Sequence, residues 1–133
     1  MNPRYADVAR RAGHRCEYCR APEVIFNFPF EVEHIVPRAS GAHETEGQLA
    51  LACRSCNVHK AARTSGTDLV SGTIVRLFNP CSDDWSEHFQ ADVASGEIHA
   101  LTAIGRATIQ QLKMNEEAQK TARKQWARLG LFP

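Results

Sequence analysis

Hydrophobic and polar positions follow two different periods in the first part of the chain. Residues 3–12 place apolar side chains on one face at helical spacing, with Asn2 as a candidate cap and Gly13 as a stop. This pattern predicts a helix. Residues 28–36 alternate with a period of two and stop at Pro37, which predicts a strand. The chain therefore begins with a helix followed by a strand.

The middle of the chain predicts a second helix and a further strand. Residues 49–53 are mostly apolar and re-enter the fold after a polar loop, and residues 54–63 predict a short helix. Residues 73–78 combine β-branched and aromatic side chains, which predicts a strand. Strands and helices in this order indicate an α+β fold.

A hairpin and two helices are expected at the end of the chain. Residues 89–93 and 97–101 flank Ser95-Gly96, which favours a β-hairpin. Thr102 and Asn115 are the candidate caps of the two helices. The last helix is expected to bury an apolar stripe made of Ala118, Ala122, Trp126 and Leu129.

Four cysteines form two Cys-x-x-Cys turns, from Cys16 to Cys19 and from Cys53 to Cys56. Two such turns supply four thiolates at the corners of a tetrahedron, which suits Zn²⁺. The segment between them is longer than in a simple zinc ribbon, so it must carry structure of its own. The alternatives are two unrelated reduced turns or a redox pair. Cys81 is expected to be a reduced, partly buried thiol.

The length of 133 residues indicates a single domain, residues 1–133, in which a metal reinforces a modest core. Residues 1–63 would form the zinc-bearing core, and residues 64–133 would add the hairpin and the C-terminal helices. The amino end lacks an apolar signal region, and no stretch approaches the ~18 apolar residues of a membrane span. We therefore expect a cytoplasmic protein with no membrane partner and with reduced cysteines.

The net charge of +1 hides an uneven distribution of charge. The segments around the two cysteine turns are basic, with Arg4, Arg10, Arg11, Arg15, Arg20, Arg54, Lys60 and Arg63. The stretch between them and the stretch over residues 83–97 are acidic. Such segregation is typical of a surface with one phosphate-facing side. Ordinary solvated faces are the alternative explanation.

A strand ending in Glu-His, four cysteines and a helix carrying an asparagine together resemble the HNH endonucleases, which have a treble-clef-like ββα-metal core. The residues that carry the resemblance are Cys16, Cys19, Glu33, His34, Pro37, Leu49, Leu51, Cys53, Cys56, Asn57 and Lys60. The resemblance implies an α+β fold with an HNH ββα-metal core stapled by a four-cysteine zinc site. A small β-hairpin and two C-terminal helices complete the expected architecture.

The resemblance also implies a metal-dependent endonuclease that acts on DNA, expected to be double-stranded. Hydrolysis needs a base that deprotonates water and a cation that absorbs charge on the phosphate. In the family the histidine of the acid-histidine pair is the general base, here His34. The acid before it and the helix asparagine, here Glu33 and Asn57, hold Mg²⁺ or Mn²⁺. Lys60 is expected to meet a phosphate oxygen. Further expected nucleic-acid contacts are Arg15, Arg54 and Arg63.

The geometry of the expected site sets two conditions. Adjacent residues of a strand point to opposite faces, so Glu33 and His34 can share a site only where the strand ends, near Pro37. Some family members place a second histidine ligand one turn after the helix asparagine, where this chain has Ala61. The catalytic cation should therefore be weakly held. His59 lies about 200° round the helix from Asn57 and should not share its metal. Four other histidines are expected in loops or in packing, namely His14, His43, His88 and His99.

Gln48 stands where the family usually has an asparagine before its Leu-x-Leu-x-Cys segment. That asparagine braces the loop that carries the base, so Gln48 joins His34 and Asn57 in the expected catalytic set. Its extra methylene means that the loop adjusts or that the nuclease is weakened. A catalytically impaired, zinc-stapled nucleic-acid-binding module is therefore the alternative function, and a cytosolic thiol-redox protein is a third.

Overall fold

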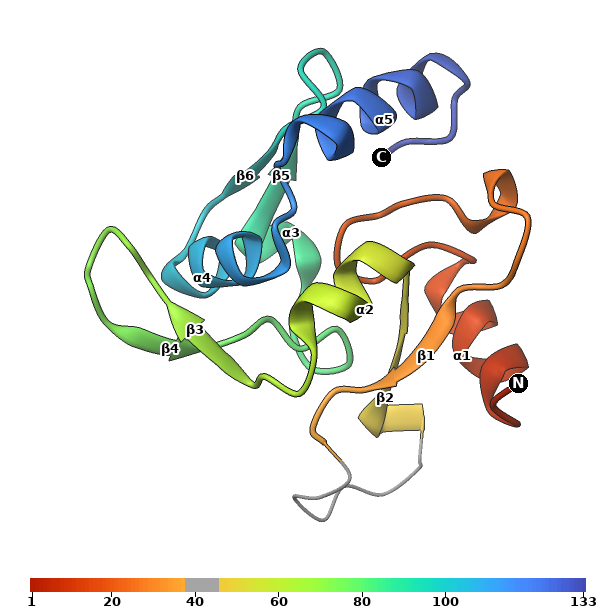
Figure 1. Ribbon diagram of the computed structural model, residues 1–133, viewed down its shortest axis with the longest axis horizontal. Helices are drawn as coiled ribbons and strands as arrows, with labels where there is room; N and C mark the ends of the chain where they lie inside the picture. The colour runs from red at the N-terminus through yellow and green to blue at the C-terminus, as the bar shows by residue number, and fades with distance from the viewer. Residues whose placement is uncertain (38–45) are drawn as a thin grey trace.

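The structure is a computed structural model of the 133-residue chain that describes residues 1–37 and 46–133 (Figure 1). His43, one of the histidines considered above, lies outside the described residues. Among the described residues, no helix combines the length and the apolar character that a membrane crossing requires.

Five helices and three two-stranded antiparallel sheets make up the described parts of the chain (Figure 1). The helices are α1 (Tyr5–Ala12), α2 (Arg54–Lys60), α3 (Trp85–His88), α4 (Ala103–Leu112) and α5 (Glu117–Arg128). The strands are β1 (Glu31–His34), β2 (Leu49–Ala52), β3 (Ser65–Thr67), β4 (Ile74–Arg76), β5 (Phe89–Ala91) and β6 (Ile98–Ala100). Short 3-10 turns, η1 (Glu23–Ile25) and η3 (Glu46–Gln48), precede β1 and β2. The α+β class predicted from the sequence is confirmed.

The β1–β2 sheet is the centre of the N-terminal half. Its register pairs Glu31 with Ala52 and His34 with Leu49, so His34 occupies the last pair of the ladder. All four residues of β2 are buried, which explains their nearly continuous apolar run. Both α1 and α2 contact this sheet, and Figure 1 shows α2 and α1 on either side of β1. The sheet therefore fixes the position of α2 relative to the end of β1.

The observed bounds of the first two elements differ from the predicted ones by a few residues. Helix α1 begins later than expected, although the Asn2 side chain still accepts a hydrogen bond from the Arg4 N–H at 2.7 Å. Gly13 ends the helix with a φ of 64°, as predicted. Strand β1 is shorter than predicted, because the N–H of Phe30 donates to the Glu23 carboxylate at 2.6 Å. That N–H therefore lies outside the ladder.

Helix α4 connects the second half of the chain to the first, because it contacts β3, β4, β6 and α2. The Thr102 hydroxyl caps it by accepting the Gly105 N–H at 3.0 Å, as predicted. The predicted hairpin is present as β5–β6. The predicted strand over residues 73–78 is present as the shorter β4. Its partner β3 was not predicted, because its Ser-Gly-Thr sequence carries no hydrophobic pattern.

Helix α5 departs from the predicted pattern in its cap and in its buried face. Asn115 does not cap it; the Asn115 side chain instead bonds both the N–H and the carbonyl of Ile98, at 2.9 and 2.8 Å. Trp126 is buried as predicted, but the centre of the buried face is Arg123. The Arg123 guanidinium donates to the carbonyls of Gly96 and Met114. The remaining members of the predicted stripe are less buried, with Ala118 and Leu129 exposed and Ala122 half-buried. Buried backbone carbonyls such as those of Gly96 and Met114 need hydrogen-bond donors, which apolar side chains cannot provide.

Candidate metal centre and adjoining pocket

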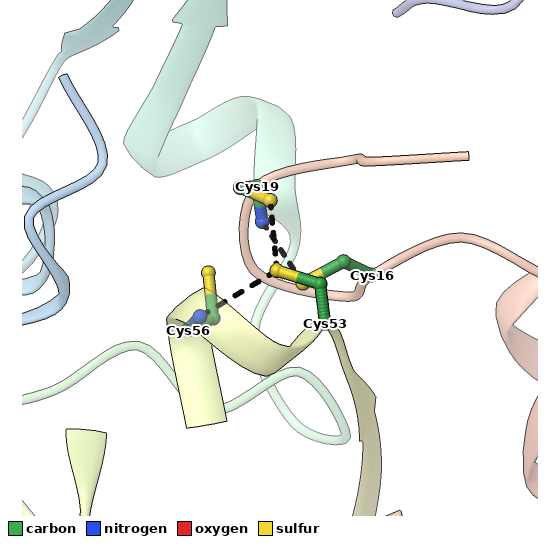
Figure 2. Close-up of side chains that lie close together, drawn as sticks. All are labelled: Cys16, Cys19, Cys53 and Cys56. Carbon is green, nitrogen blue, oxygen red and sulfur yellow. Dashed lines mark hydrogen bonds between the residues drawn. The ribbon is translucent and has the colours of Figure 1, made fainter. Parts of the chain in front are cut away.

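The side chains of Cys16, Cys19, Cys53 and Cys56 converge on one point (Figure 2). The first two come from the turn after α1, and the others from the end of β2 and the start of α2. All four are buried, and their sulfur atoms lie within 4.8 Å of one another. The four cysteines are therefore positioned to form a metal site, as predicted. Their burial does not suit thiol exchange with a partner, which needs an accessible thiolate.

Backbone hydrogen bonds hold both cysteine turns in shape. The Cys16 sulfur accepts the N–H of Cys19, and the Cys53 sulfur accepts the N–H of Cys56, each at 3.5 Å. Cys53 is also the N-terminal cap of α2. The same residue therefore ends the buried strand, caps the helix that carries Asn57 and supplies one sulfur to the cluster. Hydrogen bonds of this kind favour the ionised form of a thiol.

The four sulfurs need a cation before all of them can ionise. Hydrogen bonds with the neighbouring thiols, led by Cys16, raise the pKa of Cys19 and Cys56 well above that of an ordinary thiol, and burial adds to the effect. Hydrogen bonds from the other three lower the pKa of Cys53. The protein alone thus disfavours ionisation of Cys19 and Cys56. An all-sulfur tetrahedral set fits Zn²⁺, whose charge would offset the remaining thiolates.

Arg123 adds a buried positive charge near the cluster. Burial lowers the pKa of Arg123, and Cys19, Cys56 and Cys53 in their ionised forms oppose that change. Its Nη1 atom has no hydrogen-bond partner among the described residues. A Zn²⁺ ion with four thiolates carries a net charge of −2, so a buried guanidinium close by is a natural counter-charge for it. This arrangement supports a metal-thiolate centre at the four cysteines.

His34 and Asn57 line one open pocket of about 370 Å³ at the end of β1 and along α2. The remaining lining residues are Val32, Glu33, Pro37, Ala61 and Ala62. Glu33 and His34 both reach this pocket although they are neighbours on a strand. Strand β1 ends at His34, so both residues can border one pocket although the Glu33 carboxylate itself is bonded in the core. The structure therefore brings together the histidine and the asparagine that the sequence singled out.

Glu33 has different partners from those expected, because it lies at only 5% exposure with both carboxylate oxygens bonded. The Tyr18 hydroxyl donates to Oε1, and Nζ of Lys60 lies 3.2 Å from Oε2. Lys60 is 1% exposed and also donates to the Ile35 carbonyl at 3.0 Å. Burial raises the pKa of Glu33, and the positive charge of Lys60 opposes this. Contrary to expectation, Lys60 does not present its ammonium group to the surface, and Glu33 is engaged within the core.

Glu31 is the carboxylate that meets Asn57. The Asn57 side-chain amide donates to Oε2 of Glu31, and Nη1 of Arg54 lies 2.9 Å from Oε1. Glu31 had no predicted role, because it lies outside the adjacent acid-histidine pair. The period of two along the strand was the available signal, because it places Glu31 on the same face of β1 as Glu33. Asn57, which lines the pocket, thus contacts the carboxylate of Glu31, whereas the carboxylate of Glu33 is bonded within the core.

Along the chain, a first cysteine turn is followed by a strand that ends at the histidine, a second cysteine turn and a helix that carries the asparagine. Residues 16–63 match the HNH endonuclease family. This HNH segment, residues 16–63, contains the four cysteines, His34 and Asn57, and it covers less than half of the chain. No curated protein and no solved structure matches the chain.

The arginines expected to contact nucleic acid have different exposures. Arg54 and Arg63, in the HNH segment, are exposed, as a phosphate contact requires. Arg15 is half-buried, and its guanidinium donates to the Leu131 carbonyl at 2.5 Å. This bond ties the first cysteine turn to the C-terminal segment. Of the three arginines, Arg54 and Arg63 are therefore better placed to meet a polyanion.

Gln48 contributes a backbone group next to the pocket. Its carbonyl accepts the N–H of Ile35 at 3.0 Å, immediately beyond the last pair of the β1–β2 ladder. Gln48 therefore lies beside the segment that carries His34, where the resemblance expects a bracing residue.

The other histidines of the described residues lie apart from the pocket, as expected. His88 is buried, 2.6 Å from the Thr102 hydroxyl, with its ring against Phe78 and Phe89. His14 pairs with Glu23 at 2.7 Å. Among the described residues, the four cysteines are the one group of three or more histidine, cysteine or acidic side chains placed to hold a metal. A cation in the His34 pocket would therefore have few protein ligands.

Proposed function

We propose that this protein is a metal-dependent HNH endonuclease that hydrolyses phosphodiester bonds in double-stranded DNA. One observation carries the proposal: His34 and Asn57, which the HNH resemblance assigns to the base and to the cation, line one open pocket within the HNH segment. The four buried cysteines hold Zn²⁺ as a structural ion, because four sulfur ligands leave no position for water or substrate.

His34 acts as the general base. Its imidazole accepts a proton from a water molecule, whose oxygen attacks phosphorus as the bond to the leaving oxygen breaks. Histidine suits this role because it titrates near neutral pH. A divalent cation, Mg²⁺ or Mn²⁺, would stabilise the negative charge that develops on the phosphate. The pocket supports this role because it is open and lies at the strand end that carries His34.

Asn57 and Glu31 are the protein ligands that we assign to the cation. The resemblance gives the carboxylate role to Glu33, but a cation at Glu33 would have to displace Lys60 or Tyr18 from a nearly fully buried group. Glu31 is more accessible, and a cation there would displace only the exposed Arg54 and turn the Asn57 amide so that its oxygen faces the ion. Two oxygen ligands leave the remaining positions to water and to the scissile phosphate, as Mg²⁺ prefers.

The DNA backbone would be held by exposed arginines near the pocket. Arg54 lies on the same helix as Asn57, and Arg63 follows that helix by three residues. Both are exposed, and guanidinium groups pair with phosphate oxygens through two parallel hydrogen bonds. These contacts give affinity without sequence preference.

A plasmid-nicking assay tests the proposal. Supercoiled plasmid is incubated with the protein and Mg²⁺, Mn²⁺ or Ni²⁺, with an EDTA control in which the retained zinc is measured. Relaxed circle would show nicking, and linear product would show paired cuts. His34→Ala should lower the rate by ~10²–10⁴ and leave DNA affinity within a few fold, because it removes a base and few phosphate contacts. Undiminished cleavage by this variant would assign the base to another residue.

The same assay decides the alternative of a non-catalytic nucleic-acid-binding module. The observation that favours this alternative is Gln48, which replaces the shorter asparagine of the family pattern beside the His34 segment. DNA binding with no product in any of the three cations would support the binding module and reject the nuclease.

A further inference from the structure

We propose that Lys60 is a positioning residue for His34, because its ammonium group binds the residues on both sides of the base. Nζ of Lys60 lies 3.2 Å from the Glu33 carboxylate and donates to the Ile35 carbonyl at 3.0 Å. Residues 33 and 35 flank His34 in the chain. One side chain from α2 therefore spans the backbone segment that carries the imidazole. This inference rests on the proposed role of His34 as the base.

The Ile35 peptide is held from both sides. Its N–H donates to the Gln48 carbonyl at 3.0 Å, and its carbonyl accepts from Lys60. The pairing of His34 with Leu49 is the last of the β1–β2 ladder, and within residues 1–37 and 46–133 the donor to the next carbonyl, that of Ile35, is Lys60. Lys60 donates this hydrogen bond from helix α2 and so holds in place the strand end that carries His34.

The environment of Lys60 suits positioning and not substrate contact. The side chain is 1% exposed, so a phosphate cannot reach the ammonium group without opening the core. Its charge is balanced by Glu33, whose other oxygen accepts the Tyr18 hydroxyl. Tyr18 follows Cys16 in the first cysteine turn. The network therefore also connects the cysteine cluster to the strand end that carries the base.

Positioning matters because a base must lie within hydrogen-bond reach of its water, and a misplacement of about 1 Å can lower the rate ~10²-fold. A residue that only balances the charge of Glu33 would behave differently. If Lys60 only balanced this charge, the stability and the rate lost in Lys60→Met would both be recovered when Glu33 is neutralised as well, because a buried pair can be replaced by neutral groups with little loss of stability. The two roles therefore predict different results for a double variant.

The test compares Lys60→Met with Glu33→Gln/Lys60→Met in the full-length zinc-loaded protein. Lys60→Met should lower both the melting temperature and the nicking rate. The double variant should recover most of the melting temperature and bind DNA within about threefold of the parent. Its nicking rate should stay about 10- to 100-fold low, because the Ile35 carbonyl still lacks its donor. Recovery of the parent rate along with the melting temperature would overturn the proposal.

An NMR measurement separates this proposal from the proposed function. The ring signal of His34, assigned by its loss in His34→Ala, should shift or broaden in the double variant as the imidazole samples other positions. An unchanged ring signal would reject positioning by Lys60. A parent protein that cuts no DNA would reject the nuclease, while the ring signal would still decide whether Lys60 holds His34.

Two further variants complete the design. Arg106→Met removes the partner of buried Asp68, away from the pocket, and should lower the melting temperature with an unchanged His34 signal and an unchanged rate. If the double variant does not fold, the triple variant Tyr18→Phe/Glu33→Leu/Lys60→Met is tested in its place. Its three apolar side chains leave no buried polar group of this network. The expected low rate and shifted ring signal are the same, and parent values for both would contradict the proposal.

Discussion

Lys60 and Glu33 form a buried ion pair, with Nζ 3.2 Å from Oε2, that joins α2 to β1 directly beside His34. Both residues lie in the HNH segment, and both were expected to face substrate or cation. The structure places their charges against each other within the core instead. Two neighbouring residues on one side of the helix therefore have different surroundings: Asn57 borders the open pocket, and Lys60 is buried against the strand end.

One zinc ion per chain should copurify with the protein, and Cys53→Ser should remove it. This substitution should lower the melting temperature by at least about 10 °C, because Cys53 supplies a sulfur and caps α2. Metal analysis and thermal unfolding provide the measurements. Cys81→Ser is the matched control, since Cys81 lies outside the cluster and should keep its zinc. A folded parent without zinc would contradict the metal centre.

Glu31→Gln and Glu33→Gln should affect different properties, the first cation binding and the second stability. Glu31→Gln should weaken Mn²⁺ binding about tenfold or more, because it removes a charged ligand beside Asn57, while the melting temperature stays close to that of the parent. Glu33→Gln should cost on the order of 2–3 kcal/mol of stability, because Lys60 loses its buried counter-charge. Calorimetric Mn²⁺ titration and thermal unfolding measure both. A larger loss of Mn²⁺ affinity in Glu33→Gln than in Glu31→Gln would show that Glu33, and not Glu31, is the cation ligand.

Gln48→Asn should raise the nicking rate or leave it unchanged. The family pattern has the shorter amide at this position, beside the backbone that carries His34, and better positioning of a base increases the rate. Rates of parent and variant at saturating Mn²⁺ give the comparison. A variant slower by more than about tenfold would show that the glutamine is fitted to this loop.

Asp68 should contribute to stability at neutral pH and lose that contribution in acid. It is fully buried and receives two hydrogen bonds from Arg106, at 2.7 and 3.0 Å. These bonds, with one from Ser71, hold the pKa of Asp68 well below its ordinary value. Because the pKa of Asp68 is lower in the folded state, its ionised carboxylate stabilises the folded protein at pH values above the unfolded-state pKa of about 3.9. This stabilisation is lost progressively as the pH falls below that value toward the folded-state pKa. Asp68→Asn should therefore melt lower than the parent at pH 7, with the gap narrowing toward pH 3. A constant gap in melting temperature would argue against this linkage.

The local part of the site was predictable from the sequence. The spacing of the cysteine turns gave four sulfur ligands, and the period of two that stops at Pro37 placed His34 at a strand end. The Ser95-Gly96 turn between two segments predicted β5–β6, and the threonine at position 102 predicted the cap of α4. Each cysteine turn, the strand end, the hairpin and the cap depend on residues that are close in the chain, where backbone geometry determines which side chains meet. The convergence of the two cysteine turns, which lie far apart in the chain, was predicted from the preference of Zn²⁺ for four sulfur ligands.

The sequence by itself determined a zinc-type cysteine cluster and an HNH-like histidine and asparagine, while the tertiary structure decided what the neighbouring charges do. Lys60 is paired with Glu33, 27 positions away, and Arg123 donates to Gly96 at the same separation. No periodicity encodes such contacts. A lysine on an amphipathic helix and a lysine buried in an ion pair have the same local sequence signals. The difference is the desolvation of each group in the assembled core, which depends on the side chains that distant segments bring to it.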